Sequence, residues 1–398
     1  MRTFFLLDID CFFASVEMAL NPSLRGLPLC VGGLRGDRGI VTCPNYEARK
    51  YGVRTAMPIR TAARMLPPEA VFLRGHYKLY GEYSDRVMTV LTGFTPDIEQ
   101  VSVDEAYMDV TGCLHFWGYD PRRMAAAIQE RVRQECGLSV SIGGAGNRIC
   151  AKIAAGVRKP GGLVIVPRGA EQAFLAPLPV EAVPGIGAKT APALHACSIR
   201  TVKEAMAHAE RHGKGGGERV NALCRQIAAC AAPSDEPIRA HEHVEKSISR
   251  DRTFGEDTGD AEQVRATLYY LTERCCKTLR QDGLMASTVA VRVRFTDFTT
   301  EQKQTSLAAP SSNEEDLFAV ALRLLALLLP PGVRIRLVGV KVSHLSPAAE
   351  EQLTLDVVPA EKISTLHRRL DALQTRYGYT SIRWGITCGV AERREERE

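Results

Sequence analysis

Length, composition and charge set the first limits on this protein. The chain has 398 residues, of which 45% are hydrophobic and 24% are charged. This composition excludes wholesale disorder, and the length predicts about two to four globular domains. The formal net charge of +5 is too small to require or to exclude a polyanionic partner.

The twelve cysteines include no CxxC pair and no zinc-type spacing with histidine. They predict free, mostly buried thiols in a reducing compartment. The N-terminal segment has no signal-peptide pattern, and the longest apolar run, Leu317–Leu329, is interrupted by Arg323. We therefore expect a cytoplasmic protein without a membrane segment.

The first part of the chain alternates predicted strands and helices. Thr3–Ile9 is typical of a buried strand, and Asp10 is expected to cap a helix that runs to Leu20. Strands are predicted at Pro28–Gly33 and Ile40–Cys43, around a turn at Arg35–Gly39. Helices are then predicted at Tyr46–Tyr51, Ile59–Met65 and His76–Leu91.

An acidic pair lies in the middle of the next segment, Asp97–Thr111. Apolar residues alternate on both sides of Asp104 and Glu105, which predicts a hairpin with two carboxylates at its tip. A helix at Pro121–Cys136 and a strand at Ser139–Gly143 follow. This order favours an α+β layer with helices on one side of a sheet.

The rest of the chain divides into a helical region and a second α+β module. Gly169–Ile227 is predicted to be helical, and residues 231–243, which lack apolar periodicity, are predicted to form a linker. The tail after Ala360 begins as an amphipathic helix and ends in a charged, solvated run, Glu392–Glu398. The second module is expected to have strands at Lys246–Thr253, Val289–Phe295 and Leu337–His344, with helices at Asp260–Gln281 and Asn313–Leu329.

Three acidic residues form a candidate metal site. Asp8 ends the first strand, while Asp104 and Glu105 lie at the hairpin tip. Carboxylates on neighbouring sheet edges repel one another unless a cation lies between them, and Mg²⁺ prefers such oxygen ligands. Spacing alone leaves a metal site and ordinary turn residues equally open for these three. For Asp10 it favours a simple helix cap.

Six motifs in order carry a resemblance to a known family. Together they resemble a Y-family DNA polymerase of the DinB or DNA polymerase IV type. The motifs are DIDCFFASVE (Asp8–Glu17), NYEARKYGV (Asn45–Val53), SVDEAYMDVTG (Ser102–Gly112), AKIAAGVRKPGG (Ala151–Gly162), PGIGAK (Pro184–Lys189) and KSISRDRTF (Lys246–Phe254).

The resemblance implies an α+β multidomain fold shaped as a right hand. The expected parts are a palm (1–10 and 75–166), fingers (11–74), a helical thumb with a helix-hairpin-helix (167–230), a linker (231–243), an α+β little finger (244–348) and a tail (349–398). It also implies template-directed, low-fidelity DNA synthesis across damaged template. The expected partners are primer–template DNA and dNTPs, bound by a monomer.

The resemblance also assigns roles within the catalytic centre. Asp8, Asp104 and Glu105 match the metal-binding carboxylates, and the carbonyl of Ile9 matches a further ligand. Two Mg²⁺ ions are implied, for which Mn²⁺ can substitute. Two such ions about 4 Å apart activate an attacking 3′ oxygen and stabilise leaving pyrophosphate.

The implied nucleotide pocket uses residues from two motifs. Tyr46, Arg49 and Lys159 match residues that hold the triphosphate, and the N–H groups of Cys11, Phe12 and Phe13 form a phosphate seat. Phe13 matches the steric gate that rejects a ribose 2′-hydroxyl, although both phenylalanines can also be read as core aromatics. Cys43-Pro44 departs from the family pattern, because a thiol is a poor hydrogen-bond donor.

DNA contacts are implied in two places. Gly185, Gly187 and Lys189 belong to the helix-hairpin-helix, whose N–H groups approach a phosphate. Basic residues on little-finger strands are expected along the duplex backbone, with an ordinary solvated sheet face as the alternative. These residues are Lys246, Arg250, Arg252, Arg292 and Arg294, which Lys341 can join.

A short motif near the end resembles a sliding-clamp-binding peptide. Gln352, Leu353 and Leu355 would dock in an apolar pocket of the clamp. Asp356 departs from the motif, and a plain edge strand is the alternative.

Two other functions compete with the polymerase. One is a template-independent or single-base nucleotidyl transferase, which inserts near the fingers would favour. The other is a non-catalytic DNA-binding adaptor, which loss of the acidic residues would favour. The chain shows no such inserts and retains all three acidic residues.

Overall fold

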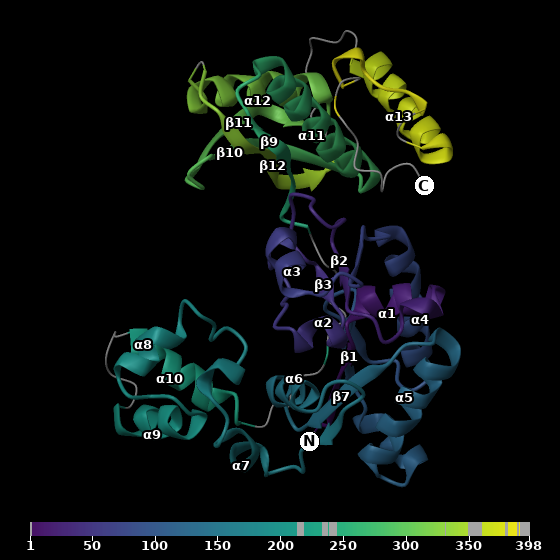
Figure 1. Ribbon diagram of the computed structural model, residues 1–398, viewed down its shortest axis with the longest axis vertical. Helices are drawn as coiled ribbons and strands as arrows, with labels where there is room; N and C mark the ends of the chain where they lie inside the picture. Colours follow the sequence, from purple (N-terminus) through teal and green to yellow (C-terminus); the bar gives the residue numbers. More distant parts are fainter. Residues whose placement is uncertain are drawn as a thin grey trace. The chain divides into compact units, whose positions relative to one another are not determined.

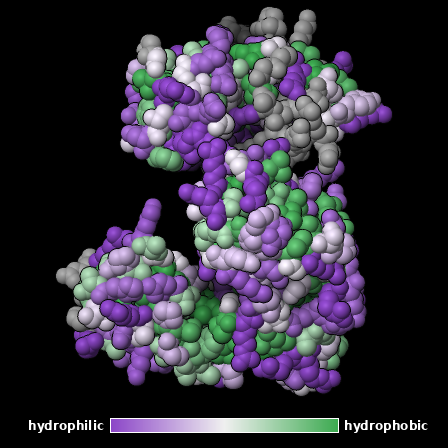
Figure 2. Space-filling view, in the orientation of Figure 1, coloured by the Kyte–Doolittle hydropathy of each residue, from purple (hydrophilic) through white to green (hydrophobic). Residues whose placement is uncertain are grey.

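The chain folds into two compact units, Met1–Glu242 and His243–Glu398 (Figure 1). The computed structural model describes residues 2–212, 219–232, 238, 245–330, 332–348, 360–378, 381–387 and 390. On the face shown in Figure 2, hydrophilic side chains predominate, with apolar ones between them.

The first unit contains two sheets and ten α-helices within its described residues. The strands are β1 (Phe4–Ile9), β2 (Leu29–Val31), β3 (Cys43–Pro44), β4 (Val71–Leu73), β5 (Ile98–Gln100), β6 (Glu105–Asp109), β7 (Val140–Ala145) and β8 (Leu163–Ile165). The helices are α1 (Phe12–Leu20), α2 (Tyr46–Lys50), α3 (Ile59–Met65), α4 (Tyr77–Thr92), α5 (Pro121–Cys136), α6 (Arg148–Val157), α7 (Glu171–Leu175), α8 (Ala191–Ala196), α9 (Val202–His212) and α10 (Arg219–Ala229).

The larger sheet has the order β5-β6-β1-β7-β8 and is covered on both faces. Phe5 and Leu7 pack in the core that includes α4 and α5, whereas Phe4 and Leu6 pack in the core that includes α6. Figure 1 shows α5 and α6 on opposite sides of β7. The prediction of helices on one side only is therefore wrong. Because β1 is a continuous apolar run rather than an alternating one, both of its faces require cover.

Close packing explains the glycine-rich end of β7. A Cβ on Gly143 would lie 2.1 Å from the carbonyl oxygen of Ala151 and 2.2 Å from the nitrogen of Ala155, both in α6. A Cβ on Gly146 would lie 2.5 Å from Oε1 of Glu171, which accepts the Gly146 N–H. Glycine at these positions therefore lets α6 and α7 approach the sheet.

The small sheet has the order β3-β2-β4 and differs from the predicted hairpin. The predicted strand Ile40–Cys43 is wrong, because only Cys43–Pro44 pairs with β2. Ile40 instead forms an isolated bridge with Pro58. The third strand, β4, pairs in parallel with β2, and its three residues are too few to show a sequence period.

The second unit is a four-stranded antiparallel sheet with helices packed on one face. The strand order is β11-β10-β12-β9. The elements are β9 (Ser247–Thr258), α11 (Ala261–Gln281), β10 (Leu284–Phe295), β11 (Thr300–Ser311), α12 (Glu314–Leu328), β12 (Ile335–Pro347) and α13 (Ala360–Tyr377). Sequence reasoning missed β11, because this edge strand is largely exposed and polar and has no buried face to set an apolar period.

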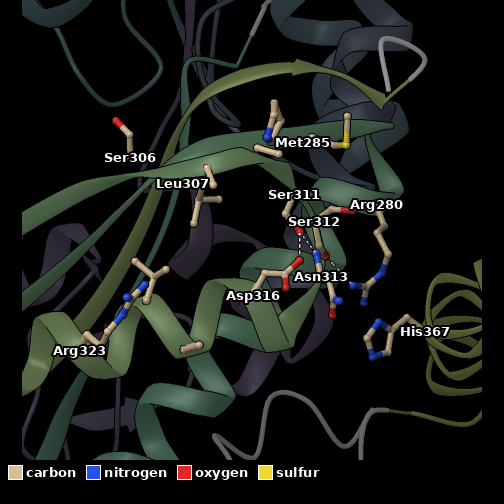
Figure 3. Close-up of a pocket in the computed structure, with 15 residues that line it drawn as sticks. Arg280, Met285, Ser306, Leu307, Ser311, Ser312, Asn313, Asp316, Arg323 and His367 are labelled. Carbon is tan, nitrogen blue, oxygen red and sulfur yellow. Dashed lines mark hydrogen bonds between the residues drawn. The ribbon is translucent and has the colours of Figure 1, made fainter. Parts of the chain in front are cut away.

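The predicted helix of the tail forms and docks on α11. The guanidinium of Arg280 bonds Asp371 of α13 at 2.7 Å and Glu314 of α12 at 2.7 Å. Nδ1 of His367 lies 2.9 Å from the other oxygen of Glu314. Burial raises the pKa of Glu314, but His367 and Arg280 outweigh burial, so the net pKa is below its ordinary value. Residues of β11 and α12 line a cavity of about 560 Å³. Arg280 and His367 lie together at one end of it (Figure 3).

Candidate active site

The pairing of β1 with β6 brings the predicted acids together. Asp8 lies directly opposite Glu105 in the antiparallel register. The N–H of Ile9 donates to the carbonyl of Asp104 at 2.9 Å. The predicted hairpin is confirmed, with Asp104 in the turn before β6 and Glu105 as its first residue. Two carboxylates distant in sequence thus lie side by side at the same end of two paired inner strands.

Each of these acids has a polar partner. Nζ of Lys159 is paired with Asp8, and Nζ of Lys152 lies 2.6 Å from Glu105. Oγ of Ser102 donates to Asp104 at 2.6 Å. Sequence reasoning missed Lys152, which lies inside one of the six motifs but carries no signal of its own beyond its charge.

Burial and crowding of like charge raise the pKa of Asp8 to about 6. Burial has the largest effect, Lys159 opposes it, and the charges of Glu105 and Asp104 reinforce it. The raised pKa therefore reflects burial of the carboxylate first and the two neighbouring acids second, which Lys159 only partly offsets.

The donor set fits hard divalent cations. Across the described ranges, no group of three or more histidine, cysteine or acidic side chains converges as a ready-made metal cage. Two of the three acids are instead held by lysines. All three offer oxygen, which Mg²⁺ prefers, and a lysine ammonium is a flexible point charge that an ion can replace. Asp8, Asp104, Glu105 and the Ile9 carbonyl thus offer oxygen donors of the kind that such ions prefer.

The structure overturns the helix-cap interpretation of Asp10. Helix α1 begins at Phe12, its cap residue is Cys11 at φ 46°, and no side chain caps it. Asp10 is only 2% exposed. Its carboxylate instead accepts hydrogen bonds from groups far away in the chain, among them the hydroxyls of Ser139 and Ser141.

Residues expected to bind the triphosphate lie near the end of β1 that carries Asp8. Tyr46 and Arg49 share a face of α2, with the guanidinium carbon 5.5 Å from the ring centroid. Nε of Arg49 donates to the carbonyl of Pro44 at 3.1 Å. Lys159 is brought to the site by its pairing with Asp8. Arg49 and Lys159 thereby supply two positive charges suited to phosphate oxygens.

Phe13 lies in an aromatic cluster, whereas Phe12 is a core residue. The Phe13 ring stacks on Tyr80 at 4.5 Å and 14°, and meets Tyr77 edge-on at 5.6 Å. Phe12 is 3% exposed. The hydroxyl of Tyr80 donates to the buried carboxylate of Glu17. Sequence reasoning missed Tyr77 and Tyr80, since only the fold brings α4 beside α1.

Cys11 and Cys43 are neighbours beside this pocket. The thiol of Cys11 donates to the sulfur of Cys43 and lowers its pKa, which burial opposes. The N–H groups of Ala14 and Phe13 lower it further. The Cys43 sulfur therefore faces part of the predicted phosphate seat. The eleven described cysteines are all free thiols, and most are buried, as predicted.

The helix-hairpin-helix segment presents its backbone outward. Ile186 is buried, while Gly185, Gly187 and Lys189 around it are exposed. Gly185 has φ 91°, a conformation that favours glycine. The N–H of Thr190 closes the turn onto the Gly187 carbonyl at 2.9 Å.

The basic residues of the second unit divide between two faces of its sheet. Arg292 lies in the same row as Gly339 and Asp251, on the face opposite Val291 and Val293.

Arg294 shares this open face with Arg292, since the two alternate with core residues along β10. Arg250 and Arg252 instead lie on the helix side: Arg250 donates to Oγ1 of Thr278, and Arg252 covers the ring of Tyr270. They are therefore separated from the open basic face. Lys246 is exposed just before β9.

Arg292 has an acidic neighbour on the open face. Its Nη1 lies 3.2 Å from Oδ2 of Asp251, and its Nε and Nη2 contact Oε1 of Gln302 at 3.2 and 3.1 Å. Asp251 reaches Arg292 across Gly339, where a Cβ would lie 1.7 Å from Oδ1 of Asp251. The expected clamp residues Gln352, Leu353 and Leu355, with Asp356, lie outside the described residues.

Comparisons with known proteins agree with this geometry. Models of the impB/mucB/samB family match residues 7–156, and its C-terminal domain matches residues 245–355. The HHH motif of the IMS family matches residues 168–196. DNA polymerase IV of Dehalococcoides mccartyi strain CBDB1 is 38% identical over 382 residues, covering 96% of both chains. The chain belongs to the Y family of DNA polymerases.

Other relatives support the same family. DNA polymerase IV 2 of Mesorhizobium japonicum is 36% identical and covers 97% of this polymerase and 94% of its own length. A solved Y-family polymerase chimera of Dbh and Dpo4 aligns with a TM-score of 0.73 at 29% identity, covering 86% of this polymerase and 98% of the chimera. DinB from Sulfolobus solfataricus aligns with a TM-score of 0.55 at 28% identity.

Family membership confirms several predictions. The polymerase is a DNA-directed DNA polymerase of the translesion class, with the α+β multidomain fold that the sequence predicted. Neither a single-base transferase nor a silent adaptor is favoured. Its family is metal-dependent, and its substrates are primer–template DNA and dNTPs. None of the described helices is both long and apolar enough to cross a membrane.

Proposed function

We propose that this polymerase extends primers by two-metal-ion catalysis at Asp8, Asp104 and Glu105, with the Ile9 carbonyl as a further ligand. The observation that carries the proposal is the β1–β6 register, which sets Asp8 opposite Glu105 beside Asp104. When bound, two Mg²⁺ ions, or Mn²⁺ in their place, would activate the primer 3′-hydroxyl and neutralise the leaving pyrophosphate.

The side chains around the acids would bind and orient the incoming dNTP. Lys159 would exchange its bond to Asp8 for one to a phosphate, which frees that carboxylate. Arg49 would add a forked contact to the triphosphate, and Tyr46 would hold it from the same face of α2. The N–H groups of Cys11, Phe12 and Phe13 would complete the seat.

Sugar selection is assigned to Phe13. Its ring is held on one side by Tyr80, so it would not yield to a ribose 2′-hydroxyl. The resulting enzyme would incorporate deoxynucleotides opposite damaged template bases with low fidelity.

DNA binding is assigned to two regions outside the catalytic centre. Gly185, Gly187 and Lys189 would contact backbone phosphates, and Arg292 and Arg294 would follow the duplex with Lys246. Arg250 and Arg252 would contribute less than expected, because both contact α11.

The proposed architecture and partners complete this function. The palm would comprise residues 1–10 and 75–166, the fingers 11–74, the thumb 167–230, the linker 231–243, the little finger 244–348 and the tail 349–398. Gln352, Leu353 and Leu355 would dock on a sliding clamp, and the enzyme would act as a cytoplasmic monomer.

Primer extension with single substitutions tests the catalytic assignment. Asp104→Ala should lower single-nucleotide extension at least about 1,000-fold and leave primer–template binding within about twofold, since DNA contacts lie elsewhere. Asp97→Ala, an acid on the same hairpin but away from its tip, is the control. Near-normal extension by Asp104→Ala would refute the assignment.

The clamp assignment needs a separate test. Replacing Leu353 and Leu355 with alanine should abolish clamp-stimulated product length without changing extension in the absence of clamp. Undiminished stimulation would show that the clamp binds elsewhere.

A further inference from the structure

The buried carboxylate of Asp10 has no part in the roles assigned so far. It is 2% exposed, although it lies two residues from Asp8 at the edge of the catalytic centre. An ionised carboxylate inside a protein is unfavourable unless hydrogen bonds replace its water. Its partners therefore indicate what it holds in place.

Two of the hydrogen bonds fasten Asp10 to the sheet. Oγ of Ser139 donates to Oδ2 at 2.8 Å, and Oγ of Ser141 donates to Oδ1 at 2.8 Å. The backbone is fixed as well, since the N–H of Asp10 donates to the Ser139 carbonyl at 3.0 Å. The carboxylate is thus tied to Ser141 of β7 and to Ser139 just before it, and β7 is itself hydrogen-bonded to β1.

The other two hydrogen bonds come from the proposed triphosphate pocket. The hydroxyl of Tyr46 donates to Oδ1 at 3.2 Å. The N–H of Gly161 donates to Oδ2 at 2.7 Å. Gly161 lies two residues after Lys159 and has φ 63°, a left-handed conformation. One carboxylate therefore joins α2 to the loop that carries the lysine.

These four donors leave no acceptor site for a metal ion. An ionised carboxylate offers about four lone-pair sites, and Asp10 fills two on each oxygen. A fourth metal-binding carboxylate would need at least one acceptor site left open for the ion. The arrangement suits a residue that holds other residues.

We propose that Asp10 is a positioning residue for the incoming nucleotide, fixing the Tyr46 ring and the Lys159–Gly161 loop relative to the sheet. This inference rests on the proposed function, because it takes Tyr46 and Lys159 as triphosphate contacts. Asp10 itself touches neither substrate nor metal.

Two substitutions separate this role from simple folding. Asp10→Ala removes all four acceptors. Asp10→Asn keeps the shape, and its remaining oxygen can stay with Gly161, whose N–H cannot reverse. Its amide then faces the hydroxyls of Tyr46 and Ser141, which can rotate to accept.

Single-nucleotide insertion kinetics with Mg²⁺ measure the effect. Asp10→Ala should lower kcat/KM for dNTP about 100-fold, the scale expected when binding groups move by about 1 Å. Primer–template affinity should stay within about twofold. Asp10→Asn should recover at least about tenfold of the loss. Asp109→Asn, a buried carboxylate at the other end of β6 that bonds Arg2 and Thr111 instead of pocket residues, should keep a normal KM.

A double-mutant cycle tests whether the effect passes through Tyr46. The combined Asp10→Ala and Tyr46→Phe variant should be little worse than Asp10→Ala alone, because Asp10→Ala has already removed the acceptor of the Tyr46 hydroxyl. Additive losses would overturn the proposal. A normal dNTP KM in both Asp10→Ala and a folded Asp10→Asn protein would overturn it as well. If Lys159→Ala and Tyr46→Phe both keep a normal dNTP KM, the pocket assignment itself fails. If these two raise KM while the Asp10 variants do not, only the present inference fails.

Discussion

Shortening Phe13 should relax sugar selection by an amount that the aromatic cluster sets. In Phe13→Val the ring that stacks on Tyr80 at 4.5 Å is lost, so the space it filled can admit a 2′-hydroxyl. Excluding one small group by shape is worth about 1–3 kcal/mol, or about 10- to 200-fold. The ratio of kcat/KM for dNTP over rNTP should fall by a factor in that range.

The same substitution also weakens the fold, so a control is needed. Losing the contacts with Tyr80 and Tyr77 should lower the free energy of unfolding by about 2–4 kcal/mol. Phe12→Val removes a neighbouring buried ring with a similar effect on stability but leaves Phe13 in place. Both variants are compared by thermal unfolding and by single-nucleotide extension with dNTP and rNTP. An unchanged sugar ratio in a folded Phe13→Val enzyme would refute the steric-gate assignment.

Three further predictions concern packing, DNA binding and pH. Gly143→Ala should lower the free energy of unfolding by more than about 3 kcal/mol, because its Cβ would meet backbone atoms of α6 at 2.1 Å. Gly156→Ala, which has open space within α6, should be neutral or stabilising in the same thermal melts. Asp251→Asn should tighten duplex binding about threefold to tenfold at low salt, because it releases Arg292. Arg292→Ala should reduce the slope of log binding constant against log salt concentration by about 0.9. Equal duplex binding by both variants would contradict this role of Arg292. Glu314→Gln should lower the free energy of unfolding by about 2–4 kcal/mol at neutral pH. The pKa of Glu314 is lowered in the folded protein, so the difference in free energy of unfolding between variant and parent is fully present above the ordinary pKa of 4.5. This difference shrinks as the pH falls below that value, and denaturant melts from pH 3 to 7 measure it.

The family and most regular elements could be predicted from the amino-acid sequence, which also pointed to Asp8, Asp104 and Glu105 as the proposed metal site. A motif such as SVDEAYMDVTG is recognised from its residue types and their order alone, because the chemistry needs those residue types at those places. Helices such as Pro121–Cys136 were predicted to the residue, because an N-cap aspartate, a first-turn proline and a terminal glycine mark both ends locally.

Features without a local sequence signal became visible only in the folded chain. The alternation of residues along a strand shows that they point to opposite faces of the sheet, but not which face the helices cover. The sequence therefore could not show that Arg250 and Arg252 lie on the helix side while Arg292 lies on the open face. The exposed strand β11 has no alternation of apolar and polar residues, and β4 and β8, with three residues each, are too short to show one.

Asp10 shows the difference most clearly. Before a helix, an aspartate predicts a cap, since that is the nearest use for its oxygens. In the fold, the backbone turns at Cys11 and directs the carboxylate to Ser139, Ser141 and Gly161, which lie 129 to 151 residues away in the chain. Its partners are set by strand pairing, and strand pairing is a property of the whole chain.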